Sequence, residues 1–417
     1  MKMKKLFYII IIIHFSLIIA NAQWIQQTSG TTTNFHSVKF INRYTGWACG
    51  TGTILKTTNG GINWVFQNHP ATSKTLTSIS IVDSLNLYCV GYFETILKTT
   101  NGGLNWNAIR NGPGGTGSSY DACFFINKNM GWIAGSGQKI WKTINGCDSL
   151  IYIYVDAGYI YDIYFKDTLT GLMCGDAGLL KRTTNGGINW YTPNIQLHYI
   201  GYSFDKISIV NNQYGWVVGE GHNPVYRTTD FGQNWDSIGY VTGAFDLYCL
   251  DFSSINTGWC GGGGTPAGRM FRTTDGGFTW QPYNNTISCY FGDFWFYNDS
   301  IGWAVGSNGV IINTTNGGVS SVNQISTSVP ASFELKQNYP NPFNNTTNIE
   351  FNIKERDFYT FEIIDILGRK TEIIFSEIKN PGIYRLSYNG INLNTGIYYY
   401  RLFNAKHNET KKFILLK

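Results

Sequence analysis

Residues 56–64 of the chain read Lys-Thr-Thr-Asn-Gly-Gly-Ile-Asn-Trp, and close variants of this stretch recur along the sequence. The Asn-Gly-Gly centre is typical of a tight turn, because glycine accepts positive φ and asparagine hydrogen-bonds its own backbone. Upstream, Gly46-Trp47 opens a short segment that ends in glycine, and a second segment closes with the basic-Thr-Thr triplet. The stretch therefore predicts two short strands, a tight turn and a further strand that contains Trp64.

This unit occurs seven times along the chain. Its spacing of roughly 40 to 45 residues is typical of four-stranded propeller blades. Two copies are incomplete, because the third ends at Leu150 and the seventh lacks its last Trp. Residues 24–28, which begin with Trp, resemble the stretch that follows each turn, such as residues 64–68. We therefore expect the N-terminal segment to supply the outer strand of the last blade and to close the ring.

The first 22 residues have the three parts of a secretory signal peptide. Lys2, Lys4 and Lys5 precede an apolar run over residues 6–19, and Ala20-Asn21-Ala22 supplies the small residues that a signal peptidase reads. The apolar run is shorter than the roughly 20 residues that a spanning helix needs, and no later stretch qualifies. We therefore expect an exported mature chain that begins at Gln23 and has no membrane span after signal removal.

The charge balance argues against nucleic acid as a partner. Charged residues make up 14% of the chain, and without the three lysines of the signal segment 28 basic residues face 26 acidic ones. A nucleic-acid-binding surface is expected to show a clear basic excess. Aromatic residues reach 16% and there are 48 glycines, a composition that suits short strands joined by tight turns.

The composition changes after residue 318. Residues 319–332 are rich in Ser, Val, Thr and Asn, which indicates a linker. Residues 333–417 then alternate as several strands, with the length and pattern of a small β-sandwich. The sequence thus predicts an all-β chain made of a signal peptide (1–22), a seven-bladed β-propeller (23–318), a linker (319–332) and a C-terminal β-sandwich (333–417).

The repeats resemble a known family. Residues 273–280, Thr-Thr-Asp-Gly-Gly-Phe-Thr-Trp, are similar to the Asp-box of the bacterial neuraminidase repeat. The complete unit resembles propellers of the photosystem II assembly/stability factor-like family, over about residues 23–320. In that family the box is a folding element, whose side chains cap the turn and whose Trp packs between strands. The resemblance implies this structural role for Asn59, Trp64, Asn101, Trp106, Asn185, Trp190, Asp230, Trp235, Asp275 and Trp280.

The C-terminal segment resembles the type A sorting domain of type IX secretion cargo. The match opens with residues 333–344, Phe-Glu-Leu-Lys-Gln-Asn-Tyr-Pro-Asn-Pro-Phe-Asn, and continues in order through later glycine-containing motifs. The resemblance implies that the type IX secretion machinery is a partner, and that the protein reaches the extracellular space or the outer-membrane surface. The residues that carry the sorting motif are Asn338, Pro340, Asn341, Pro342, Gly368, Gly396 and Tyr398.

Candidate ligand-binding residues lie near the starts of the predicted first strands, which line the central channel of a propeller. Several repeats carry an acid there, so we expect a partial ring of acids at the channel mouth. Such a ring could bind a cation, a cationic peptide group or sugar hydroxyls; alternatively, each Asp caps its connecting turn. The candidates are Asp121, Asp162, Asp205, Asp246 and Asp293, with Glu220 and His222 from a long turn of the fifth repeat.

Three classes of function stay open. The leading interpretation is a non-catalytic binding module, surface-bound or secreted, for an unidentified protein or glycan. The alternatives are a glycoside hydrolase (sialidase- or endoglucanase-like) that uses the channel-mouth acids, and a structural adhesion component without a discrete ligand. No sialidase constellation is visible, because Arg182, Arg227 and Arg272 occupy a repeated position that the blade explains better than a site does. We therefore expect no enzymatic activity and assign no catalytic residue.

Neither a metal nor a cofactor is expected. All eight cysteines fall in the propeller region without a Cys-x-x-Cys pair, and the histidines of the mature chain are scattered. We interpret the cysteines as small buried strand residues, although export permits disulfides.

Overall fold

The computed structural model describes residues 24–112, 118–195, 202–221, 223–244, 246–263, 268–283, 287, 289–318, 322–344, 346–390 and 393–416. Contacts divide the chain into two units, Trp24–Gly317 and a second one that includes Gly318–Lys417, and each is described by itself. Apart from the single-turn 3₁₀-helix η1 (Asp176–Gly178), the regular elements of the described residues are β-strands. The chain is therefore all-β, as the sequence predicted.

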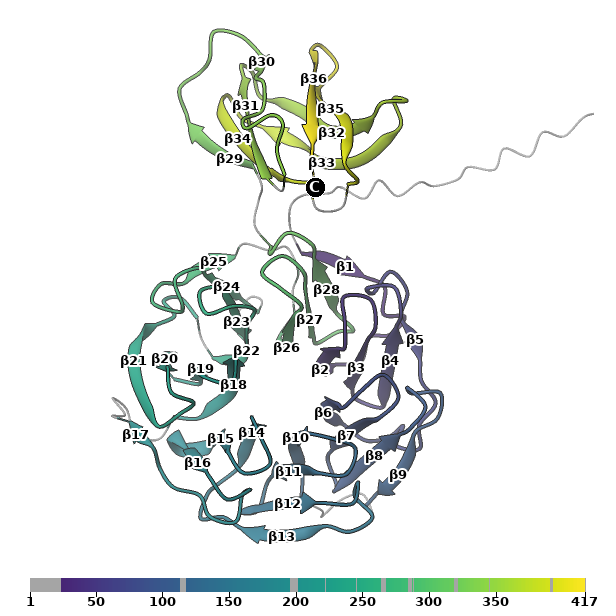
Figure 1. The fold of residues 1–417 in the computed structure, drawn as a ribbon, viewed down its shortest axis with the longest axis vertical. Coiled ribbons are helices and arrows are strands. Elements are labelled where there is room, and N and C mark those ends of the chain that lie inside the picture. The colour runs from purple at the N-terminus through teal and green to yellow at the C-terminus, as the bar shows by residue number, and fades with distance from the viewer. Residues whose placement is uncertain are drawn as a thin grey trace, which may run out of the picture. The chain divides into compact units, whose positions relative to one another are not determined.

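The first unit consists of sheets that follow one another along the chain, each with its first strand on the inside of a ring (Figure 1). The first sheets are β2 (Phe35–Phe40), β3 (Gly46–Gly50), β4 (Thr53–Thr57) and β5 (Val65–Phe66); β6 (Leu76–Ile81), β7 (Leu87–Gly91), β8 (Thr95–Thr99) and β9 (Asn107–Arg110); and β10 (Tyr120–Phe125), β11 (Gly131–Gly135), β12 (Lys139–Thr143) and β13 (Ile151–Tyr154). Next come β14 (Ile160–Phe165), β15 (Gly171–Gly175) and β16 (Leu180–Thr183), and then β18 (Phe204–Val210), β19 (Tyr214–Gly219), β20 (Pro224–Thr228) and β21 (Asn234–Tyr240), with β17 (Asn194–Ile195) added parallel to β21. The last two sheets are β22 (Leu247–Phe252), β23 (Gly258–Gly262), β24 (Met270–Thr273) and β25 (Gln281–Tyr283), and β26 (Phe291–Phe296), β27 (Gly302–Gly306) and β28 (Ile311–Thr314) with β1 (Ile25–Gln27).

The Gly-Trp-x-x-Gly pattern of the second strands follows from close packing. All five residues of β3 are buried. A Cβ on Gly46 would lie 2.4 Å from the ring of Phe40, and one on Gly50 would lie 1.9 Å from the carbonyl oxygen of Asn34. Only glycine fits at these two positions, because the neighbouring strand and its side chains occupy the space that a side chain needs.

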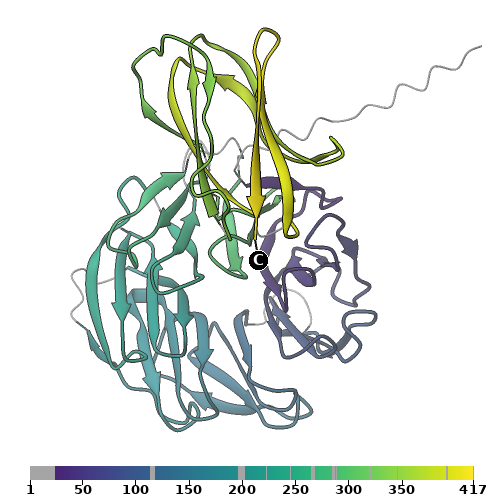
Figure 2. The same cartoon turned by 45° about the horizontal axis from the view of Figure 1, so that its top comes forward.

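The first strands contact one another in sequence and close a ring (Figures 1 and 2). Strand β2 contacts β6, and the contacts continue through β10, β14, β18, β22 and β26 back to β2. Neighbouring sheets also share an aromatic contact: Trp132 of β11 stacks on Phe165 of the next sheet with ring centroids 3.5 Å apart. Trp303 of β27 makes the same contact with Phe40 of β2 at 3.8 Å, across the junction between the last sheet and the first.

The N-terminal segment completes the last sheet. Strand β1 pairs antiparallel with β28, where we expected it from the missing Trp of the seventh repeat. Trp24 packs edge-on against Phe296 with ring centroids 5.6 Å apart, as Trp64 packs edge-on against Phe40 of its own sheet. Trp24 therefore takes the structural place of the missing Trp.

In several copies the basic residue before the turn links adjacent sheets. The Nζ of Lys56 donates a hydrogen bond of 2.7 Å to the carbonyl of Gly102, which lies in the turn of the next sheet. Lys98 makes the equivalent bond to Gly146, at 2.9 Å. Arg182 donates through Nε to the carbonyl of Phe231 at 3.0 Å. These contacts explain the repeated basic position by packing between sheets.

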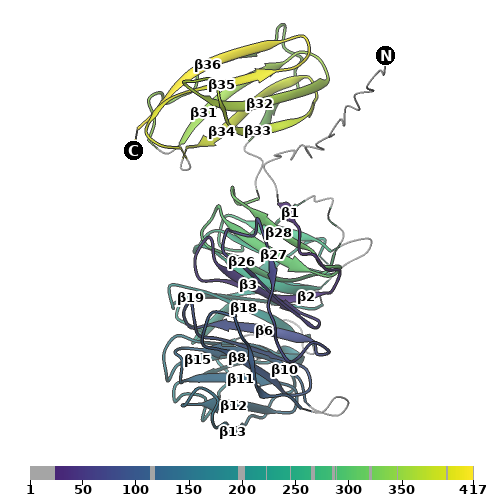
Figure 3. The same ribbon diagram turned by 90° about the vertical axis from the view of Figure 1, so that its right-hand side faces the viewer.

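The second unit contains two four-stranded sheets that contribute to one core (Figure 3). The core includes Ile349 and Phe351 from one sheet and Phe361 and Tyr400 from the other. In spatial order the sheets are β29 (Val322–Ser326), β34 (Gly382–Asn389), β31 (Thr346–Ile353) and β30 (Glu334–Leu335), and β33 (Lys370–Lys379), β32 (Asp357–Asp365), β35 (Gly396–Phe403) and β36 (Asn408–Leu415).

One expectation about this region needs correction. Residues 319–332 were expected to form a linker, but Val322–Ser326 is strand β29 and pairs antiparallel with β34. The physical reason is that Val322 is buried in the core of the second unit and the segment hydrogen-bonds along β34. This stretch therefore belongs to the sheet and is not a free connection.

Candidate functional site

The first strands share a backbone irregularity that decides which side chains reach the ring axis. Each has a register shift between its first and third residues, for example between Phe35 and Ser37 of β2 and between Phe291 and Asp293 of β26. Such a bulge re-aims the side chains that follow it. The third residues of the seven first strands are Ser37, Ser78, Ala122, Asp162, Lys206, Cys249 and Asp293.

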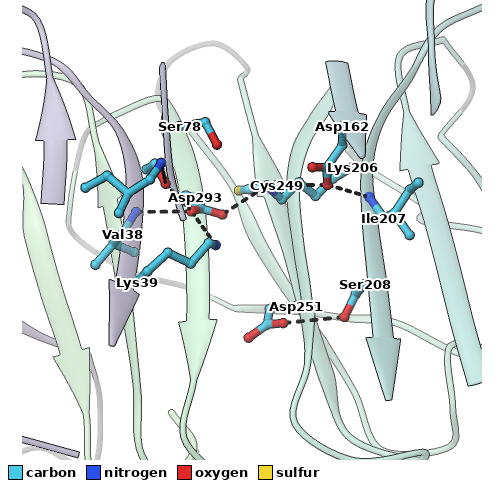
Figure 4. A network of polar contacts seen from close by, with 12 residues as sticks. Val38, Lys39, Ser78, Asp162, Lys206, Ile207, Ser208, Cys249, Asp251 and Asp293 are labelled. Atoms are coloured by element: carbon cyan, nitrogen blue, oxygen red, sulfur yellow. Dashed lines mark hydrogen bonds and ion pairs between the residues drawn. The ribbon is translucent and has the colours of Figure 1, made fainter. Parts of the chain in front are cut away.

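Asp293 is the centre of a polar network between these strands (Figure 4). Its side chain is 1% exposed, and its Oδ2 lies 2.8 Å from Nζ of Lys39. The same oxygen accepts hydrogen bonds from the backbone N–H of Val38 at 3.1 Å and from the hydroxyl of Ser37 at 3.2 Å. Burial raises the pKa of Asp293, but Lys206 and Lys39 outweigh burial and hold this pKa below its usual range. Asp293 is therefore an ionised, paired carboxylate.

Lys206 connects Asp293 to a second carboxylate (Figure 4). Its Nζ lies 3.5 Å from Oδ2 of Asp162 and 3.6 Å from Oδ1 of Asp293. Asp162 also accepts the backbone N–H of Ile207 at 3.1 Å. The network thus joins the sheets that begin with β2, β14, β18 and β26. Two of the candidate acids, Asp162 and Asp293, are paired within the protein.

Asp251, two residues after the third position of β22, is a further buried acid of the axis. Its Oδ1 accepts the hydroxyl of Ser208 at 3.4 Å, and its Oδ2 accepts the N–H of Phe296 at 2.7 Å. Burial raises the pKa of Asp251 to about 6, although the nearby Lys39 opposes this rise. Asp251, Lys39 and Lys206 were not among the residues predicted from the sequence; the available signal was a charged residue within each predicted first strand.

The structure divides the expected partial ring of acids between two places. Asp162 and Asp293 occupy third positions, Asp121 and Asp205 occupy second positions, and Asp246 precedes β22. The bulge separates these positions in space, so an alignment by sequence alone joins residues that point differently. Two acids therefore belong to the buried axial network, and the others lie toward the strand starts.

Asp205, Glu220 and Asp246 come together at one rim of the ring. Phe204 pairs with Gly219, so Asp205 and Glu220 lie at the same end of their hairpin. Burial raises the pKa of Asp205 to about 8, and the negative charge of Glu220 adds to this rise. The pKa of Glu220 is raised by burial and by Asp246 and Asp176. Asp176, which was not among the predicted site residues, therefore belongs to this rim group.

The rim also carries tyrosines. The hydroxyl of Tyr248 lies 3.5 Å from Oδ2 of Asp246. Burial raises the pKa of Tyr161 to about 12, and Asp176 and Asp205 contribute to the rise. Tyr159, which is 48% exposed, stacks beside Tyr161 with ring centroids 6.4 Å apart. Acidic and aromatic groups thus share the same end of the strands.

The remaining predicted acid, Asp121, contacts its own turn. Asp121 accepts the hydroxyl of Ser119 at 3.0 Å, and burial raises its pKa. Its capping contact agrees with the turn-stabilising alternative. His222 lies outside the described residues.

The Asp-box residues form turn-stabilising contacts. The hydroxyl of Thr57 donates to Oδ1 of Asn59 at 3.0 Å and accepts the N–H of Gly61 at 2.8 Å, while Asn59 accepts the N–H of Asn63 at 3.0 Å. The Trp64 ring is buried. The same hydrogen bonds recur around Asn101, Asn185, Asp230 and Asp275, and buried rings follow at Trp106, Trp235 and Trp280, with Trp190 partly buried.

The sorting-motif residues divide into inward and outward groups. Asn338 is buried, and its side chain donates to the carbonyl of Pro340 at 3.0 Å and to the hydroxyl of Thr347 at 2.9 Å. Asn341 accepts the N–H of Ile414 at 2.9 Å. Pro340 and Pro342, in contrast, are exposed. The asparagines therefore fix the loop, whereas the prolines lie on its surface.

The glycines and the tyrosine of this motif shape other turns. Gly368 has a φ of +76° in the turn closed by Asp365, whose Oδ1 accepts the N–H of Arg369 at 2.9 Å. Gly396 begins β35, and the hydroxyl of Tyr398 donates to the carbonyl of Asn394 at 3.0 Å. These contacts are structural.

Sheets in a closed ring, with Asp-box turns between strands of the same sheet and a separate β unit after them, define a propeller-like protein. Residues 337–416 match the family of secretion system C-terminal sorting domains. Residues 18–120 and 149–243 match the family of the photosynthesis system II assembly factor YCF48. The chain thus combines a YCF48-like propeller with a secretion sorting domain, and both resemblances stated from the sequence are confirmed.

Individual relatives agree with these families. The chain is 28% identical over 125 residues to the photosystem II assembly lipoprotein Ycf48 of Synechococcus sp. (strain CC9902), a match that spans 29% of this chain and 35% of that protein. A structure of YCF48 bound to D1 peptide has a TM-score of 0.58 and 19% identity, covering 70% of this chain and 96% of the other. The structure of YCF48 from Cyanidioschyzon merolae has a TM-score of 0.58 and 18% identity, and the match covers 70% of this chain and 99% of the other. The structure of the GH74 enzyme of Niastella koreensis has a TM-score of 0.57 and 11% identity, and the match covers 93% of this chain and 67% of the enzyme.

The sorting domain indicates export to the cell surface or the outer membrane. Within the described residues, no helix combines the length and the apolar character that crossing a membrane requires.

Proposed function

We propose that the chain is an exported seven-bladed β-propeller with a C-terminal sorting β-sandwich, and that it acts as a non-catalytic binding module for a protein or glycan. In this proposal each sheet of the ring is one blade. The closed cycle of contacts between first strands supports the blade assignment. The shared core of the two C-terminal sheets supports the sandwich.

The observation that carries the binding proposal is the rim group. Burial raises the pKa of Asp205 and of Glu220, the nearby carboxylate of Asp246 raises both further, and the exposed Tyr159 lies at the same end of the strands. Like charges held close together are costly, so a cationic group of a ligand would relieve the repulsion. Tyrosine rings add a flat surface for a sugar or a cationic side chain. We place the ligand at this rim and not in the axis, where the charges are already paired.

The fold neighbours support a peptide as one ligand class. The YCF48 structure is of a protein bound to a D1 peptide. Peptide binding by this chain rests on likeness of fold together with the charge of the rim. The relative's partner is not carried over, because the sorting domain directs this chain out of the cell.

A glycoside hydrolase is the second candidate, and one observation favours it. The pKa of about 8 at Asp205 keeps that carboxyl protonated at neutral pH, as a general acid requires. Arg182 donates to the carbonyl of Phe231 in the neighbouring sheet, so its role is packing and not the arginine cluster of a sialidase-like site. For this reason we prefer the non-catalytic proposal. A structural adhesion component without a discrete ligand is the third class.

The decisive experiment is a binding and hydrolysis screen of the purified full chain on glycan and peptide arrays. The test variant is Asp205→Asn/Asp246→Asn, and the matched control is Asp148→Asn/Asp156→Asn, which removes two exposed acids of the same unit. Binding that is lost in the test variant and kept in the control supports the rim site. Turnover that is lost in the test variant overturns the non-catalytic proposal. No binding to either array would favour the adhesion component.

A further inference from the structure

The outer face of the second unit carries a polar pocket beside the sorting motif. The pocket has a volume of about 270 Å³ and is lined by Lys336, Gln337, Tyr339, Asn348, Glu350 and Arg385. These residues come from the segment after β30 and from β31 and β34. Their neighbours Ile349 and Leu386 point into the core, so the pocket lies on the opposite face of this sheet.

Tyr339 stands out in this pocket. Tyr339 is 82% exposed as a residue, although Asn338, on its N-terminal side, is buried. Its backbone is fixed by two hydrogen bonds to Asn348, of 2.9 and 3.0 Å. Among the described residues the phenol ring has no hydrogen-bond or ring partner. A large ring on a fixed backbone has only two side-chain torsions to order on binding, so it gains contact area at low entropic cost, which is a property of interface hot spots.

The charges around the pocket leave a positive excess. Glu350 pairs with Arg385 at 2.7 Å and with Lys336 at 3.3 Å, so two cations share one carboxylate. The side chains of Arg385 and Lys336 remain 52% and 42% exposed. The hydrogen bond that Arg385 donates is the largest cause that holds the pKa of Glu350 below its usual range, and the hydrogen bond from Lys336 adds to it. Arginine is the side chain best suited to a second carboxylate, because its planar fork offers several donors.

We propose that Tyr339, with Arg385 and Lys336, forms the surface through which the export machinery recognises this sorting domain, and that the partner presents an acidic side chain beside a site for the Tyr339 ring. The inference rests on the sorting domain and is independent of the ligand of the ring unit. The residues of the sorting motif then have two different roles. Asn338 and Asn341 hold the loop, and Tyr339 faces the partner.

The test compares export of full-length variants in a bacterium that has a type IX secretion system. The test variants are Tyr339→Ala and Arg385→Gln. The matched controls are Phe358→Ala, which removes a ring that is 50% exposed in the other sheet, and Arg369→Gln, which removes an exposed, ion-paired arginine from a turn. The amount of protein on the surface and in the medium is measured against the amount in the periplasm.

We expect about a tenfold loss of surface and secreted protein for each test variant, equivalent to about 1.4 kcal/mol of recognition, with periplasmic accumulation. The controls should be exported like the wild type. Calorimetry of the purified full chains should give unchanged unfolding temperatures for Arg385→Gln and Tyr339→Ala. Normal export of both test variants, or an equal loss in the controls, overturns the proposal. Ligand binding by the ring unit should be unaffected by these substitutions. If the ring unit binds nothing on the arrays, the proposed function fails but this inference does not.

Discussion

The Nζ of Lys206 lies 3.6 Å from Oδ1 of Asp293, although a complete sheet separates their two sheets along the ring. Burial lowers the pKa of Lys206, but the carboxylates of Asp162 and Asp293 outweigh burial and raise this pKa above its usual value. The pair is therefore charged on both sides. Because the contact spans the axis, it couples sheets that share no backbone hydrogen bonds.

Replacing Asp293 tests how much the ring depends on this network. Asp293→Ala leaves Lys206 and Lys39 without their shared carboxylate inside the protein. Removing one partner of a buried ion pair costs about 3–5 kcal/mol, so the free energy of unfolding should fall by that amount. All 13 tryptophans lie in the ring unit, so urea unfolding followed by tryptophan fluorescence reports this unit alone. Asp156→Ala, at an exposed position, should change stability by less than about 0.5 kcal/mol. Equal effects of the two substitutions would contradict a stabilising role of the network.

Closure of the ring by the N-terminal strand makes a second prediction. Trp24 is 5% exposed and contacts Trp259 and Phe296, with ring centroids 5.4 and 5.6 Å apart. Trp24→Ala should reduce the free energy of unfolding by about 3–5 kcal/mol, as large-to-small core substitutions do. Gln26→Ala, an exposed position on the same strand, should be nearly neutral. If Trp24→Ala proves as mild as Gln26→Ala in urea unfolding, β1 does not close the ring in solution.

Much of the ring was predictable because its determinants are local and repeated. The Asn59 turn, the Gly46-Trp47 pair and the spacing of the copies all follow from short-range chemistry. The place of Trp24 could also be inferred, since the seventh copy lacked one Trp and residues 24–28 offered one. The strand at Val322–Ser326 was missed because five residues without turn signals read equally well as a linker or as an edge strand.

The candidate site was harder to predict because it depends on contacts between distant residues. Asp162, Asp205 and Asp293 occupy similar places in the sequence, yet the bulge directs them differently. Lys206 pairs with Asp293, which lies 87 positions later in the sequence, and no local sequence pattern predicts this pairing. Likewise, Asn338 and Tyr339 are adjacent in the motif, but only the packed structure separates the buried side chain from the exposed one.

The pH dependence of stability gives a direct test of the rim. Burial, followed by the charge of Glu220, raises the pKa of Asp205 to about 8, whereas an unfolded Asp titrates near 3.9. Between these values the folded protein binds a proton that the unfolded chain does not, so this group makes stability fall as the pH rises from about 4 to 8. Asp205→Asn removes the effect. The stability advantage of the variant over the wild type should grow by about 4 kcal/mol between pH 5 and pH 8.5, since each of the roughly three pH units up to the folded pKa removes about 1.4 kcal/mol from the wild type alone. Urea unfolding followed by tryptophan fluorescence at both pH values measures the difference, with Asp156→Asn as the exposed control. Parallel stability curves for the wild type and Asp205→Asn would mean that Asp205 is ionised and solvated at neutral pH, and the rim would then lack the mutual repulsion on which the proposed binding site depends.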